Sequence, residues 1–139
     1  MKTKYSFRNL FFYSLLFLLI GCSKTVFITA LGSVDKLIYF NIYEDRNNPR
    51  NIGVNLKNIS FAVEEKVNEK FIILWEFHGS GSIGVVKYGI LPEGFILDTK
   101  PEKLKSNSKY YVFASGIDDT SVHTSLFFCT DNSGIVKDC

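Results

Sequence analysis

The sequence has few of the residues from which metal sites are built. Only two of its 139 residues are histidine and only three are cysteine. His78 and His123 are isolated, and no HxxxH or CxxC spacing brings several metal ligands together. The sequence therefore predicts no metal site.

The N-terminal apolar run is too short for a permanent transmembrane helix. Leu10–Ile20 has about eleven uncharged residues, whereas a helix that spans the bilayer core of roughly 30 Å needs about 20. The run follows a basic start with Lys2, Lys4 and Arg8 and no acidic residue. A basic start before a short apolar run is the pattern of an export signal.

The segment Leu19-Ile20-Gly21-Cys22 resembles the lipobox of bacterial lipoproteins, with an aliphatic residue, a small residue and the cysteine in their usual places. The resemblance implies that a diacylglycerol is attached to Cys22 and that a peptidase cuts before it. Residues 1–21 would then be a lipoprotein signal peptide, and residues 22–139 a single domain anchored in the bilayer by its acyl chains. An uncleaved N-terminal anchor with an incidental cysteine is the alternative.

The residues after the cysteine bear on the location. Ser23 and Lys24 follow Cys22, and no Asp is present there to signal retention in the inner membrane. The resemblance therefore implies a protein of the cell envelope, in the outer membrane and facing the periplasm of a Gram-negative host.

Loss of the signal peptide would remove the excess of positive charge. Three of the sixteen basic residues lie in residues 1–21, which leaves thirteen against fourteen acidic residues. The formal net charge then changes from +2 to about −1. No basic stripe remains, so we expect no nucleic-acid partner.

Cys129 and Cys139 remain as an even pair in a compartment that permits disulfides. The turn residues after Thr130 predict a hairpin with a four-residue loop that pairs Thr130 with Ile135. That register puts Cys139 opposite Leu126, on the other face from Cys129 and about 10 Å along the strand. Bridged cysteines need Cα atoms less than about 7 Å apart. A disulfide therefore requires a bulge or a last residue that curls back, and two free thiols are the alternative.

Most of the remaining chain alternates between apolar and polar residues with the period of a β-strand. Alternation is clear over residues 36–43, 59–64, 71–77 and 110–114, and weaker strands are expected at 25–31, 83–88, 124–130 and 135–137. Turn signals recur about every ten residues, which predicts an all-β chain folded as a single antiparallel β-sandwich. Residues 62–70 also fit a short helix. The residues expected inside are Phe71, Ile73, Trp75, Tyr110 and Val112.

Leu104 stands six residues before Tyr110, which opens a predicted strand. This spacing resembles the tyrosine corner of immunoglobulin-like and fibronectin-type sandwiches, in which the tyrosine hydroxyl bonds to the backbone a few residues upstream. The resemblance implies a sandwich that is immunoglobulin-like in outline.

The glycine spacing of Gly79–Gly84 fits that of dinucleotide-binding sites. Such a site needs the glycine turn to open a helix. Here β-branched residues, a glycine and a proline follow in Val85–Pro92, and they form a poor helix and a good short strand. We therefore expect a flexible hairpin loop and no cofactor.

No other pattern predicts catalysis. Ser80 lies near His78, but GSGS is not the GxSxG nucleophile elbow. The adjacent carboxylates Glu64-Glu65 and Asp118-Asp119 are typical of a solvated surface, and the segment 116–120 has too few oxygen ligands for calcium. The sequence therefore favours a non-enzymatic protein that acts by binding, with a small hydrolase as the enzymatic alternative.

The central part of the chain resembles the small immunity lipoproteins of type VI secretion. These share the motif I-x-x-Y-G-x-x-P-x-G-F, followed by P-x-x-L and a Y-x-V strand. The match covers residues 71–136, and its residues here are Val85, Tyr88, Gly89, Pro92, Gly94, Phe95, Pro101, Leu104, Tyr110 and Val112.

The resemblance implies a protein that neutralises a secreted antibacterial effector by binding it, with no catalytic residues and no small-molecule substrate. A structural or assembly lipoprotein of the envelope, or a lysozyme-inhibitor-like lipoprotein, are the alternatives within the binding class. The turns expected to contact a partner are 44–51, 78–82 and 116–121.

Overall fold

The computed structural model describes residues 24–45, 47–48 and 50–139. Cys22 and the signal peptide lie outside the described residues, so their assignment stays a prediction. Within the described part the chain has no helix. Its strands are β1 (Phe27–Gly32), β2 (Ile38–Tyr43), β3 (Val54–Val67), β4 (Lys70–Ile83), β5 (Val85–Lys87), β6 (Ile96–Thr99), β7 (Lys109–Asp118), β8 (Thr120–Thr130) and β9 (Val136–Asp138).

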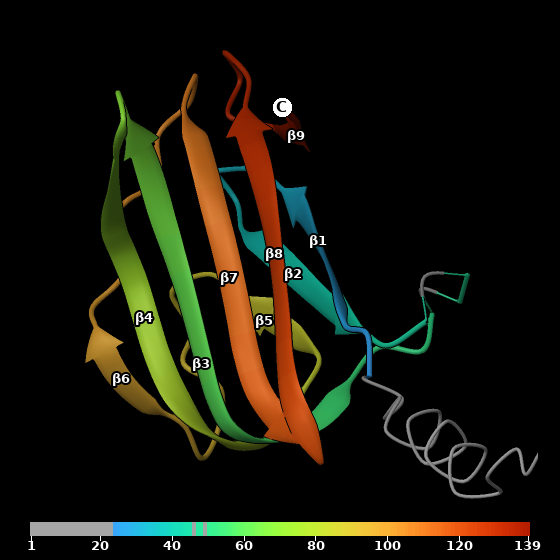
Figure 1. Ribbon diagram of the computed structural model, residues 1–139. Helices are drawn as coiled ribbons and strands as arrows, with labels where there is room; N and C mark the ends of the chain where they lie inside the picture. Colours follow the sequence, from blue (N-terminus) through green and yellow to red (C-terminus); the bar gives the residue numbers. More distant parts are fainter. Residues whose placement is uncertain (1–23, 46, 49) are drawn as a thin grey trace, which may run out of the picture.

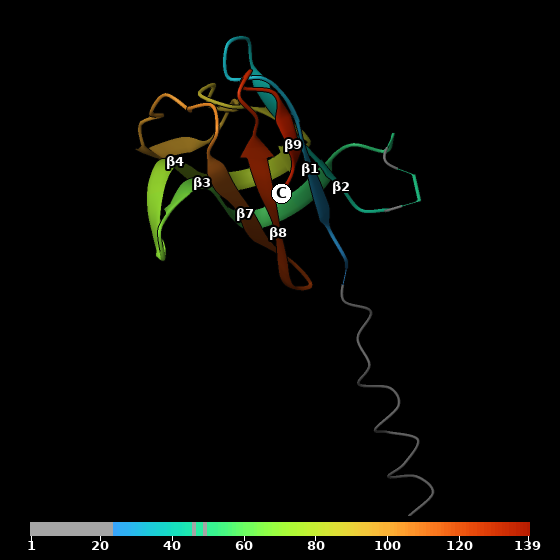
Figure 2. The same cartoon turned by 90° about the horizontal axis from the view of Figure 1, so that it is seen from above.

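The strands form two antiparallel sheets that pack face to face. One has the order β1-β2-β5 and the other β6-β4-β3-β7-β8-β9. The larger sheet faces the viewer in Figure 1 and the smaller one lies behind it, an arrangement seen from above in Figure 2. The β-sandwich prediction is confirmed. Immunoglobulin constant domains divide their strands four and three, whereas this sandwich divides them three and six.

Aromatic side chains hold the two sheets together. Phe40 on β2 is fully buried, and its ring lies 5.6 Å from those of both Phe61 and Phe128 on the larger sheet. Phe61 stacks on Phe77 at 4.9 Å and meets Trp75 edge-on at 5.8 Å. Such pairs contribute about 0.5–1.5 kcal/mol each beyond their burial. Phe40 therefore links the smaller sheet to two strands of the larger one.

Tyr110 forms the corner that the sequence predicted. Its ring is fully buried, and its hydroxyl accepts a hydrogen bond from the Lys105 N–H at 2.7 Å and donates one to the Lys105 carbonyl at 3.1 Å. Leu104 packs into the core beside it at 6% exposure. One side chain thus satisfies both backbone groups of Lys105.

The prediction that Phe71 and Ile73 point inward is wrong. Trp75 pairs with Val63 and Ile73 pairs with Glu64, so Leu74 is an extra residue in β4. A bulge of this kind reverses the faces of all residues beyond it. Trp75 stays inside at 0% exposure, whereas Phe71 and Ile73 are 46% and 43% exposed on the outer face.

The glycine-rich segment is not the predicted loop. Residues 78–83 continue β4 and pair with Val54–Ser60 of β3. Gly79 is needed at its position because a Cβ there would lie 2.8 Å from the buried Phe95 ring. Residues 62–70 are not helical either, since β3 continues to Val67 and turns into β4 through Asn68, which has a φ of 56°.

The C-terminal hairpin has one more loop residue than expected. Thr130 pairs with Val136 rather than Ile135, and Cys129 pairs with Lys137. This register puts Cys139 on the same face as Cys129. Their Cα atoms are 5.1 Å apart and their sulfur atoms lie within bonding distance. The one-residue difference removes the geometric objection to a disulfide.

Candidate binding surface

The outer face of the six-stranded sheet carries large apolar side chains that the fold leaves exposed. Glu64 on β3 lies opposite Ile73 on β4 and Tyr111 on β7, and Tyr111 lies opposite Phe127 on β8. Residues opposite one another in antiparallel strands share a face. One row therefore crosses four strands and is apolar apart from Glu64.

Three rings on this face form an aromatic cluster, made of Phe71, Tyr111 and Phe127. Phe71 lies 5.7 Å from Tyr111 and 6.2 Å from Phe127, and the last two are 4.8 Å apart. Phe71 and Phe127 are 46% and 41% exposed. Exposed apolar patches of this kind mark surfaces that bind other molecules.

Lysines border the aromatic cluster at one end of the sheet. Lys66 lies opposite Phe71 and places its Nζ 5.9 Å from that ring, while the Lys109 Nζ lies 4.9 Å from the Phe127 ring. Lys109 pairs with Cys129, which pairs with Lys137. We call Lys66, Lys109 and Lys137 the lysine row. Each cation over a ring contributes about 0.5–1 kcal/mol at an exposed site.

One carboxylate lies inside the apolar row. Partial burial raises the pKa of Glu64, and the negative charge of Glu76 raises it further. Glu76 faces outward as well, and its Oε2 accepts a hydrogen bond from Thr99 Oγ1 at 3.3 Å. Glu64 is thus a partly buried carboxylate whose solvation depends on what covers this face.

The same face becomes polar nearer the other end of the sheet. His78, Ser60, Ser115 and His123 lie opposite one another across β4, β3, β7 and β8. We call these residues the polar row. The two histidines that the sequence shows as isolated therefore share a face but stand at its two sides.

His78 is the only one of these residues with an acidic partner within the described ranges. Its Nδ1 lies 2.8 and 2.7 Å from the two carboxylate oxygens of Asp98. A carboxylate in this position orients the imidazole ring. The nearest hydroxyl in the polar row belongs to Ser60, which lies directly opposite His78 on β3. In the part of the chain that the structure describes, no hydrogen bond joins Ser60 to His78. Ser80 accepts a hydrogen bond from the Asn58 N–H at 3.0 Å instead.

Lys24 fixes the first described residues to the end of the sheet below the polar row. Its Nζ lies 2.8 Å from Glu44 Oε1 and 3.0 Å from Asp118 Oδ2. These contacts raise the pKa of Lys24, with Glu44 the larger cause. Asp118 ends β7 at its turn into β8, which lies at the foot of the sheet in Figure 1. We call this the Lys24 end.

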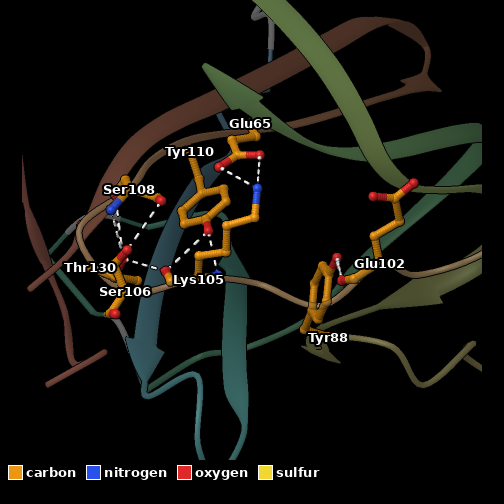
Figure 3. Close-up of polar contacts among 8 residues, drawn as sticks. All are labelled: Glu65, Tyr88, Glu102, Lys105, Ser106, Ser108, Tyr110 and Thr130. Atoms are coloured by element: carbon orange, nitrogen blue, oxygen red, sulfur yellow. Dashed lines mark hydrogen bonds and ion pairs between the residues drawn. The ribbon is translucent and has the colours of Figure 1, made fainter. Parts of the chain in front are cut away.

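The residues that carry the immunity-lipoprotein resemblance have structural contacts. Tyr88 donates a hydrogen bond to the Glu102 carbonyl at 2.7 Å, and burial raises the pKa of its hydroxyl. Tyr110 binds the backbone of Lys105, whose carbonyl also accepts a hydrogen bond from Thr130 Oγ1 at 2.7 Å (Figure 3). Lys105 Nζ lies 3.2 Å from Glu65 Oε2. The two tyrosines thus fix the segment that leads from β6 to β7.

Metal ligands do not cluster in the described ranges, where no group of three or more His, Cys, Asp or Glu side chains could hold an ion. In the segment 116–120, which the sequence showed to have too few oxygen ligands for calcium, Asp118 pairs with Lys24. No helix among the described residues is long and apolar enough to cross a membrane. No protein-family model, curated protein or solved structure matches the chain.

Sequence reasoning missed the outer-face surface. It expected partner contacts in turns, and one of those turns, residues 78–82, is part of β4. The signal was present in Tyr111 and Phe113, which alternate with the buried residues Tyr110, Val112 and Ala114. When both alternating sets of residues in a strand contain aromatic side chains, both faces of the sheet are apolar at that strand.

Proposed function

We propose that the chain is a lipid-anchored lipoprotein of the bacterial envelope that acts by binding another protein, a secreted antibacterial effector that it neutralises. Neutralisation is stoichiometric: the bound domain covers the active site of the effector or blocks access to its target. Acyl chains on Cys22 hold the protein at the outer membrane, facing the periplasm where such an effector arrives.

The exposed aromatic cluster is the observation that carries the binding function. Phe71, Tyr111 and Phe127 pack on one another outside a core that is already complete on the other face of the same sheet. Protein interfaces are enriched in aromatic residues at their centre. A partner that covers these rings would remove apolar surface from water, at about 25 cal/mol per Å².

The position of Lys24 indicates which end of the domain the proposed anchor would hold. Lys24 is held at the foot of the sheet by Glu44 and Asp118. Cys22 precedes it by two residues, which reach at most about 7 Å. An acylated Cys22 would therefore hold the foot of the domain near the membrane surface.

A gene-deletion experiment tests the function. Cells that lack only this gene are challenged with kin that secrete the product of the neighbouring effector gene, and we expect them to be killed. Cells complemented with the intact gene are the control. Unchanged survival, with no complex in a pull-down of that effector, would favour a structural or assembly lipoprotein.

Lipidation is tested separately with Cys22→Ser. The wild-type chain should carry acyl-chain mass and partition into detergent, and the variant should lose both. A wild-type protein with neither property contradicts the anchoring part and leaves the binding part open.

A further inference from the structure

We infer that the partner binds the aromatic cluster with an apolar surface that is bordered by carboxylates, and that it meets the sheet at the end away from Lys24. This inference deepens the proposed function and rests on it, because it specifies the chemistry and position of the protein–protein contact. It replaces the turns as the expected contact surface.

The centre of the surface is apolar and preorganised. Phe71, Tyr111 and Phe127 contact one another, so little side-chain freedom remains to be lost on binding. Ile73 and Phe113 extend the patch along β4 and β7 on the same face. Rigid aromatic groups contribute large contact area at low entropic cost.

The border of the surface is positively charged. Lys66, Lys109 and Lys137 form one row beyond the rings. The Lys66 Nζ is 3.9 Å from Glu69, whose side chain is 96% exposed, and this weak ion pair leaves the lysine available. Within the described ranges, Lys109 and Lys137 have no carboxylate within 4.0 Å. Carboxylates on the partner complement this row.

The position of the Lys24 end indicates that the aromatic cluster does not bind the membrane in which this chain would be anchored. Tyr111 lies seven residues before Asp118 on β7, a separation of roughly 23 Å along the strand. The aromatic cluster therefore stands well away from the end where an acylated Cys22 would enter the bilayer. A partner in the periplasm can reach it.

A second copy of the chain fits this surface poorly. The outer-face rows that contain the aromatic cluster and its neighbours offer only Glu64 and Glu76 as carboxylates. Glu69, the further carboxylate beside the lysine row, already pairs with Lys66, so a second copy offers Lys109 and Lys137 few free carboxylates at this border.

Photocrosslinking tests the inference on the full chain in vesicles of phosphatidylethanolamine and phosphatidylglycerol. Benzoylphenylalanine replaces Phe127, and the matched control has the same group at His123, which is exposed in the polar row of the same strand. Two synthetic peptides of equal length serve as probes, one alternating phenylalanine with aspartate and the other phenylalanine with lysine.

We expect the acidic peptide to crosslink at position 127 and neither peptide to crosslink at position 123. Lys109→Glu should reduce the crosslink by up to about fivefold, the upper limit for one exposed charge pair. Lys87→Glu, a change of an exposed lysine on β5 of the other sheet, should leave it unchanged.

Equal crosslinking of both peptides removes the charge part of the inference. Crosslinks to lipid or to a second copy, in place of the acidic peptide, overturn it. If the gene protects cells from their kin but the peptide does not crosslink, the proposed function holds and this surface is wrong. If the peptide crosslinks but the gene does not protect cells, the surface binds such a partner and the proposed function is wrong.

Discussion

The two faces of the six-stranded sheet are both rich in aromatic residues, but only one face is buried. Phe61, Phe77 and Phe128 on the inner face are at most 1% exposed. Phe71 and Phe127 on the outer face are more than 40% exposed. Folding explains the first set, because those rings fill the space between the sheets. Folding does not explain the exposed rings of the outer face. The comparison therefore distinguishes aromatic side chains that stabilise the fold from those that are available to bind a partner.

The largest expected difference between the faces comes from truncating one aromatic on each. Trp75→Ala leaves a cavity in the core and should lower the free energy of unfolding by about 3–5 kcal/mol. Phe127→Ala on the outer face should lower it by less than about 1 kcal/mol. Denaturant unfolding of both variants measures the contrast, and equal losses would show that the outer rings also stabilise the fold.

The Cys129–Cys139 pair is an outer-face contact that should stabilise the protein. Closing a loop of this length contributes about 2–3 kcal/mol by constraining the unfolded chain. The double change Cys129→Ser and Cys139→Ser should therefore lower stability by that amount under oxidising conditions and change little in excess reductant. Two reactive thiols in the denatured, unreduced protein would contradict the bridge.

Loss of a single hydroxyl on the inner face should have a smaller effect. Tyr110→Phe leaves the N–H of Lys105 without its partner and removes one of two donors to the Lys105 carbonyl, at a cost of about 1–2 kcal/mol. Tyr111→Phe is the matched control on the outer face, where we expect a change below about 0.5 kcal/mol. Thermal unfolding of the two variants provides the measurement, and equal shifts would argue against the corner.

The smallest effect concerns pH. The folded-state pKa of Glu64 is raised above its unfolded value, so this group contributes stability below the unfolded pKa and loses it as pH rises through the folded pKa. Glu64→Gln should lack that loss, and its stability relative to wild type should improve as pH rises from about 3 to 7. Denaturant unfolding across this range tests the sign. A relative stability that falls with pH would mean that the carboxylate is better solvated when folded.

The sequence predicted those features of the fold that depend on residues close together in the chain. Alternation identified the strands around Trp75 and Tyr110, and the Leu104–Tyr110 spacing predicted the corner, because each depends on residues close in the chain. The faces of Phe71 and Ile73 depended on one extra residue, Leu74, and no period-2 pattern contains the phase change of a bulge. The outer-face cluster was missed for a related reason. Alternation says which residues share a face, whereas the packing of the other sheet decides which face is covered.

The Tyr110 corner also has a consequence for hydrogen exchange. Lys105 lies in a segment outside the sheet ladders, where backbone amides ordinarily exchange as the loop opens. Its N–H is bound to a hydroxyl whose ring is fully buried, so it meets solvent only when the segment separates from that ring. The Lys105 amide should therefore exchange more slowly than the unbonded amides of the same surface segment, and its rate measures how firmly Tyr110 holds the segment to the core.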